Sequence, residues 1–144
     1  MTFQTSVATA LPLVAPLQCP DTAAAIVIVA QSLQPDLAQG FQIDALRLRL
    51  EVERAFGGSD ADGAWDWKLA YEAGEAALVL FLRKFGRALL ARAGSTAAML
   101  PVLAKVAGLL PTHTRRSEEM ERYQQFSTPL PMGLAALAAA QITP

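Results

Sequence analysis

The chain has 144 residues, of which 53% are hydrophobic and 17% charged, and its formal net charge is −1. These values are typical of one globular domain and exclude a disordered composition. The near-zero charge argues against non-specific binding of nucleic acid through a basic surface, but it is compatible with a local basic strip. A single cysteine, Cys19, and a single histidine, His113, exclude an internal disulfide and a Cys/His zinc site, so no metal is expected.

Residues 1–20 combine small apolar side chains with threonine, serine and proline. The prolines oppose both a helix interior and a central strand, so we predict a loosely ordered arm. This segment lacks the positively charged start of a secretory signal. The apolar runs at 26–30 and 76–82 are far shorter than the roughly 20 residues of a membrane span. We therefore expect a cytoplasmic protein with no membrane partner.

The next segment is predicted to begin with a helix over about residues 23–33. Asp21 and Thr22 are suited to cap its start, and Pro35 is expected to end it. The β-branched run at 26–29 is also compatible with a buried strand. The flanking alanines favour the helix.

Residues 39–56 carry two conflicting patterns. The stretch 46–53 alternates strictly between apolar and charged residues, which is typical of a strand. However, it is rich in helix formers, and its arginines and glutamates lie four positions apart with opposite charge, which favours a helix. We predict a helix that ends at Gly57 and Gly58.

The longest periodic run covers residues 64 to about 92 and is predicted to be the central helix of the domain. A polar stripe along it, interrupted by Val79, consists of Lys68, Glu72, Glu75, Arg83 and Arg87. The rest of its surface is apolar, so other helices should cover most of it. The preceding Asp-x-Asp-Gly spelling at 60–63 lacks the full ligand set of a calcium loop and is interpreted as a loop that leads into a helix.

Three further helices are predicted towards the end of the chain. One runs from about 97 to 110 after a cap at Ser95 or Thr96, and a short charged helix follows from 117 towards 125. The last covers about 132–141. Ser127 or Thr128 is suited to cap it, and Pro129 or Pro131 fits its first turn. The expected fold is therefore all-α, an irregular bundle of about five or six helices around one long central helix.

Several short motifs between residues 65 and 129 resemble those of a known protein family. Phe126-Ser127-Thr128-Pro129, after two glutamines, is similar to the aromatic-x-Thr-Pro motif of amino-methylating DNA methyltransferases. The wider pattern resembles the strawberry notch-like methylase–helicase proteins of phages, plasmids and bacteria. It is carried by residues 65–68, 70–73, 80–86 and 110–119. The resemblance covers the second half of the chain well and the first forty residues poorly.

The resemblance implies that Phe126, Ser127, Thr128 and Pro129 contact S-adenosylmethionine in the parent protein. The Gly-rich cofactor loop, the catalytic motif and the nucleotide-binding motif of that family do not occur in these residues. We therefore expect a helical domain over 21–125, and a cofactor-motif segment over 126–144 that starts a truncated α/β methyltransferase domain. The expected partners are the downstream methyltransferase and helicase domains and, through them, DNA. The chain alone should be inactive.

Two basic clusters are weaker candidates for DNA contact. Arg83, Lys84 and Arg87 lie beside two phenylalanines, and Arg115 and Arg116 form the second cluster. Cations beside aromatic rings can follow a phosphate chain, but basic residues near the end of a helix also arise simply from the helix dipole.

Three other sets of residues have plainer interpretations. Glu72 and Glu75 have the spacing of an acid–base pair, but their polar neighbours favour a solvated stripe. Trp65 and Trp67 are more often core or interface anchors than base-stacking platforms. If the family resemblance does not apply, the alternative is a stand-alone helical module for protein interaction or oligomerisation, with the long helix as its partner surface.

Overall fold

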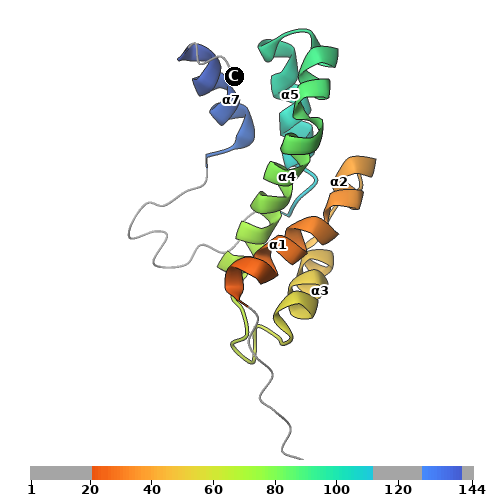
Figure 1. Ribbon diagram of the computed structural model, residues 1–144, viewed down its shortest axis with the longest axis vertical. Coiled ribbons are helices and arrows are strands. Elements are labelled where there is room, and N and C mark those ends of the chain that lie inside the picture. Colours follow the sequence, from red (N-terminus) through yellow and green to blue (C-terminus); the bar gives the residue numbers. More distant parts are fainter. Residues whose placement is uncertain (1–20, 112–127, 141–144) are drawn as a thin grey trace, which may run out of the picture.

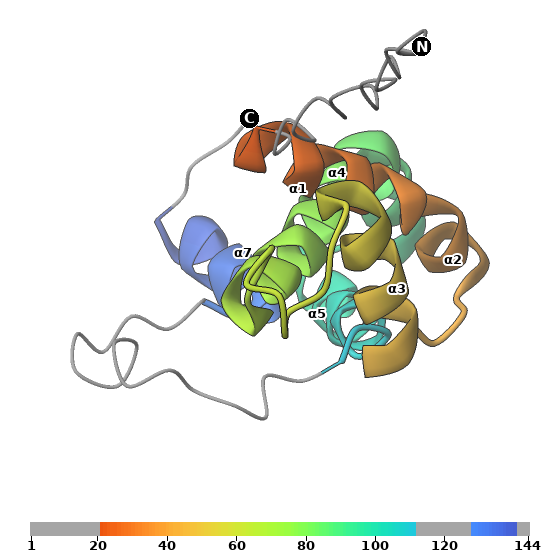
Figure 2. The same ribbon diagram turned by 90° about the horizontal axis from the view of Figure 1, so that it is seen from below.

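The computed structural model describes residues 21–111 and 128–140, and every regular element in these ranges is a helix. The elements are α1 (Thr22–Ser32), α2 (Gln34–Gln39), α3 (Ala45–Phe56), α4 (Trp67–Ala93), α5 (Thr96–Ala107) and α7 (Leu130–Ala139). The predicted all-α bundle with one long helix is confirmed. Figure 2 shows α4 in the middle, with α1, α3, α5 and α7 arranged around it.

Helix starts follow local capping chemistry. The carboxylate of Asp21 accepts from the backbone amide of Ala23, which caps α1 as predicted. Asp66 caps α4 in the same way at 2.8 Å from the amide of Leu69, and Ser95 caps α5. Glycines in the left-handed conformation end α3 at Gly57 and α4 at Gly94. The predicted helix is confirmed and the alternative of a strand at 26–29 is wrong, since these residues lie within α1.

Two predicted boundaries were wrong, whereas the end of α1 before Pro35 is confirmed. Pro35 itself lies in the first turn of the next helix, where no amide donor is needed. The helix expected from residue 39 begins at Ala45, after a cap by Asp44. The last helix begins at Leu130 and not at about 132, and its N-cap is Pro129, which makes no side-chain cap hydrogen bond, and not Thr128. Ser127 and the predicted helix at 117–125 lie outside the described residues.

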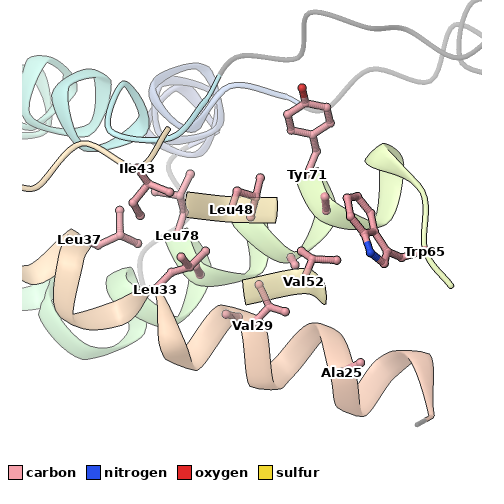
Figure 3. Packing of buried hydrophobic residues seen from close by; sticks show 14 of the residues in the cluster. Ala25, Val29, Leu33, Leu37, Ile43, Leu48, Val52, Trp65, Tyr71 and Leu78 are labelled. Atoms are coloured by element: carbon pink, nitrogen blue, oxygen red, sulfur yellow. The ribbon is translucent and has the colours of Figure 1, made fainter. Parts of the chain in front are cut away.

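The hydrophobic core lies between α1, α3 and the first half of α4. Figure 3 shows its largest side chains meeting from these elements, among them Val29, Leu33, Leu48, Val52 and Leu78. A polar contact also joins α2 to α4, because the side-chain amide of Gln34 donates a hydrogen bond to the carbonyl of Ala77 at 2.6 Å. The alternating stretch of α3 therefore has a helical explanation, since Leu48 and Val52 are buried one turn apart while Leu46 and Leu50 face solvent.

The long helix α4 changes character along its length. The buried residues of α4 all lie between Ala70 and Phe81, and no residue of this helix after Phe81 is fully buried. The expectation that other helices cover most of α4 holds for the first half only. In Figure 1 the second half extends past α1 and α3, where only α5 and α7 accompany it. This second half, together with α7, forms the least covered part of the bundle.

Candidate functional site

A cleft of about 490 Å³ lies where the start of α7 approaches α4. The polar groups at its wall are Tyr71 and Glu75 of α4 and Thr128 just before α7, and Pro129 lies beside Thr128. Its volume falls within the roughly 300–1,000 Å³ that small-molecule sites occupy. The remaining lining is mostly apolar and consists of Leu48, Gly74, Leu78, Val79, Ala107, Leu110, Pro111 and Leu130.

Tyr71 is placed at the boundary between the core and this cleft. Its side chain is only 7% exposed, and in Figure 3 its hydroxyl points away from the labelled core residues. Its ring lies 5.8 Å from that of Trp67, which in turn contacts Trp65 edge to face at 5.5 Å. This aromatic row fixes the direction of the tyrosine, because each ring restricts the rotamers of the next.

Glu75 is half-buried one turn after Tyr71, and it lines the cleft beside Leu78. The prediction that Glu72 and Glu75 share one solvated stripe is confirmed for Glu72, which is exposed, and wrong for Glu75. Glu75 shares the cleft with Thr128, Pro129 and Leu130 at the start of α7, and the sequence did not indicate this arrangement. A carboxylate in a partly desolvated cleft favours a cationic ligand group over an anionic one.

The segment before α7 brings the predicted cofactor motif to the cleft. Thr128 and Pro129 both line it and are exposed to solvent, while Leu130 packs against the core and anchors them. The backbone amides of Met132 and Gly133 donate to the carbonyl of Pro129 at 2.9 and 3.1 Å, which holds the turn. Phe126 and Ser127 lie outside the described residues.

The predicted nucleic-acid residues are only partly brought together. Arg83, Lys84 and Arg87 are exposed on the second half of α4, and the ammonium of Lys84 lies 5.1 Å from the centre of the Phe85 ring. Phe81 packs at 5.1 Å from Phe85 but is only 7% exposed, so it cannot stack on a base. The second basic cluster, Arg115 and Arg116, lies outside the described residues, as do His113 and Cys19.

Both tryptophans were predicted to be core or interface anchors, and Trp65 lies in the core while the half-buried Trp67 packs against it. Trp65 is 3% exposed, and its indole nitrogen donates to the carbonyl of Gly58 at 3.0 Å. In the loop before α4 the hydroxyl of Ser59 donates a hydrogen bond to the carboxylate of Asp62 at 2.6 Å.

Within the described ranges, no cluster of three or more potential metal ligands is present. No helix in those ranges has the length and apolar character needed to cross a bilayer.

The ion pairs of the described residues lie on α2, α3 and the loop after α3. Glu51 is 3% exposed and is contacted by Arg47 and Arg54. Hydrogen bonding to Asp36 is the main reason that the pKa of Arg47 is raised, and bonding to Glu53 raises the pKa of Arg49. This network joins α2, α3 and the loop after α3, so its role is structural.

The chain matches no protein-family model, and no curated protein or solved structure shows significant similarity to it. What it does must therefore be argued from the cleft and from the exposed surfaces.

Proposed function

We propose that this chain is the helical N-terminal part of a DNA amino-methyltransferase and helicase-like protein. In this role it presents Thr128 and Pro129 beside α4, and the motif Phe126–Pro129 contacts S-adenosylmethionine bound to a catalytic domain encoded outside these residues. The observation that carries the proposal is the shared cleft, in which Thr128 and Pro129 lie opposite the hydroxyl-bearing Tyr71 and the carboxylate of Glu75.

The chemistry of the cleft suits part of such a cofactor. S-adenosylmethionine carries a sulfonium and an ammonium, which a half-buried carboxylate such as Glu75 attracts. The hydroxyl of Thr128 can donate to the carboxylate or ribose of the cofactor. The aliphatic wall formed by Leu78, Leu110 and Leu130 suits a purine face. The exposure of Thr128 and Pro129 leaves them accessible to a second domain.

Incomplete burial of α7 supports the same proposal. None of its ten residues is fully buried, although all are uncharged, and Met132 and Leu137 are 63% and 50% exposed. A helix this apolar is stabilised by contact on more than one side. In the proposed protein the α/β core would cover the outer side of α7 and complete the cofactor site.

Calorimetric titration with S-adenosylmethionine tests the proposal. We expect no measurable heat with the 144-residue chain and micromolar binding with a chain extended by the sequence that follows it, lost in the Phe126→Ala variant. Glu75→Gln in the extended chain should weaken binding roughly 10-fold, about 1.4 kcal/mol. The matched control is Glu72→Gln, one turn nearer the start of α4, exposed and outside the cleft.

Two outcomes would overturn the proposal. Tight binding of the cofactor by the short chain would show a self-sufficient site. Failure of the extended chain to bind, or equal effects of the two glutamine variants, would remove Glu75 and the cleft from cofactor binding.

A stand-alone oligomerisation module is the second candidate, and one observation favours it. Leu46 and Leu50 lie one turn apart on the outer face of α3 and are 63% and 49% exposed, and the nearby chain segment exposes 56% of Phe41. Sedimentation velocity over a concentration series tests it. A dimer that becomes a monomer in Leu46→Glu/Leu50→Glu supports this candidate, and a monomer at every concentration excludes it.

A further inference from the structure

A second groove runs along the exposed half of α4 and meets the proposed cofactor cleft at Thr128 and Leu130, which line both. It has a volume of about 340 Å³ and is bounded by α4, α5 and α7. Leu82, Gly86 and Leu90 form its α4 side, Leu103 its α5 side, and Leu134 and Leu137 its α7 side. Leu82 to Leu90 spans about 12 Å, which matches two turns of a helix. The rest of the lining is Met99, Thr128, Leu130 and Gly133, so the groove is apolar except for the hydroxyl of Thr128.

One edge of this groove is cationic. Successive residues of a helix are rotated by about 100°, so Arg83 and Arg87 lie on the flank next to Leu82 and Gly86, one turn apart. Both arginines are exposed, and neither takes part in the ion pairs found among the described residues. The opposite wall, α7, carries no charge.

The charge of the described chain is divided between its two halves. Residues 21–75 contain ten acidic and four basic side chains, whereas 76–111 and 128–140 contain five basic and no acidic ones. The groove lies entirely in the basic half. An acidic partner is therefore attracted to this end of the bundle and repelled from the other.

We propose that this groove binds an amphipathic helix of a partner protein that carries a leucine-type apolar stripe and a row of carboxylates along one flank. The apolar stripe fills the space between Leu82, Leu90 and Leu137, and the carboxylates pair with Arg83 and Arg87. Helix-in-groove recognition uses this combination of anchors at i, i+3 or i+4, and i+7 with charges at the rim. A single-stranded nucleic acid is the poorer fit, because an aliphatic floor offers no ring on which bases stack.

Gly86 lines the groove, and substituting it tests whether the groove binds the partner helix. A side chain at Gly86 would meet only Leu82 of its own helix, at 3.8 Å or more, so a leucine there projects into the groove without entering the core. The change also raises helix propensity, so Gly86→Leu should fold at least as stably as the natural chain. The variant therefore separates occlusion of the groove from loss of structure.

The probes are two fluorescent peptides of about three to four helical turns, both with leucine at i, i+3, i+4 and i+7. One has glutamates on a single flank and the other has lysines in their place. In fluorescence anisotropy we expect the acidic peptide to bind at least about 10-fold tighter than the basic one, and Gly86→Leu to weaken it by a similar factor.

Charge reversal tests the rim. Arg83→Glu/Arg87→Glu should exchange the preference, so that the lysine peptide binds better than the glutamate peptide. The control Arg92→Glu/Lys105→Glu changes the net charge by the same amount at residues outside the rim. It should leave the preference for the glutamate peptide unchanged. Equal binding of the two peptides, or indifference to Gly86→Leu, would overturn the proposal. So would an oligonucleotide that binds tighter than the acidic peptide and is unaffected by Gly86→Leu, since that result assigns the face to nucleic acid.

Discussion

The indole nitrogen of Trp65 donates a 3.0 Å hydrogen bond to the carbonyl oxygen of Gly58, and this contact closes the loop that connects α3 to α4. Donor and acceptor are seven positions apart in the sequence. The loop thereby fixes where α4 begins, and with it the direction of Trp67 and Tyr71. Trp65 is the first ring of the row Trp65, Trp67 and Tyr71 that leads to the cleft, and this hydrogen bond holds it in place.

Substitution of Trp65 should therefore show two separable contributions to stability. Trp65→Phe retains a large ring but leaves the carbonyl of Gly58 without its donor, at a cost of about 1–2 kcal/mol. Trp65→Ala also removes a buried ring and should cost about 3–5 kcal/mol. Urea unfolding followed by circular dichroism measures both. Equal losses in the two variants would show that the hydrogen bond contributes nothing.

Two glycines should respond to alanine in opposite ways. A Cβ at Gly74, in the middle of α4, would lie 3.6 Å from Leu110, which is ordinary contact, so Gly74→Ala should stabilise the chain by about 0.5–1 kcal/mol. A Cβ at Gly58 would lie 2.8 Å from the Cβ of Ala64, so Gly58→Ala should destabilise it by about 1–3 kcal/mol. Thermal unfolding of the two variants provides the comparison, and a stabilised Gly58→Ala would contradict this packing.

The buried carboxylate of Glu51 should depend more on one arginine than on the other. Arg47 contacts both Glu51 and Asp36, whereas Arg54 contacts Glu51 alone and is 75% exposed. Arg47→Met should therefore cost about 1–2 kcal/mol, and Arg54→Met less than about 1 kcal/mol because solvent screens it. Chemical unfolding of the two variants at neutral pH and low salt measures this order. The reverse order would show that Arg54 holds the carboxylate.

Arg47 and Arg49 make no pH-dependent contribution to stability in the neutral range. Because the pKa of each is raised in the folded chain, mainly by hydrogen bonds to Asp36 and Glu53, the stability that they add is present below the usual arginine range. It is lost only as the pH rises through the raised folded-state values.

Sequence reasoning identified the helices better than it placed them relative to one another. Period and capping chemistry predicted α1, the end of α3 and most of α4, because these depend on neighbours within a few residues. The start of α3 was wrong for a tertiary reason. The backbone amide of Ile43 donates to the carbonyl of Leu109 at 2.7 Å, and Gln42 also bonds this part of the chain, so residues 40–44 are held outside a helix.

The cleft shows the same limit. The Thr128–Pro129 pair was predicted as a site from its resemblance to a motif, and its position beside α4 was not predicted. Glu75 was interpreted as a solvated residue because its sequence neighbours are polar. Glu75 is half-buried, and it shares its cleft with Thr128 and Pro129, more than fifty positions away, which no local sequence pattern indicates.

Variants of Thr128 distinguish a structural role of this residue at the start of α7 from a role in binding. A capping threonine usually contributes about 1 kcal/mol, but the first turn of α7 receives no side-chain hydrogen bond. Thr128→Ala should therefore change the free energy of unfolding by less than about 0.5 kcal/mol. Asp66→Ala, which removes the real cap of α4, should cost about 1 kcal/mol under the same conditions.

In the extended chain, the proposed cofactor contact predicts a different pattern for the same position. Thr128→Ala and Thr128→Val should both weaken S-adenosylmethionine binding by roughly 5- to 10-fold, because each removes the hydroxyl. Thr128→Ser should retain binding, since the hydroxyl remains. Calorimetric titration distinguishes these cases. If Thr128→Ala instead destabilises the chain as much as Asp66→Ala and leaves binding unchanged, Thr128 is a helix-start residue and has no part in holding the cofactor.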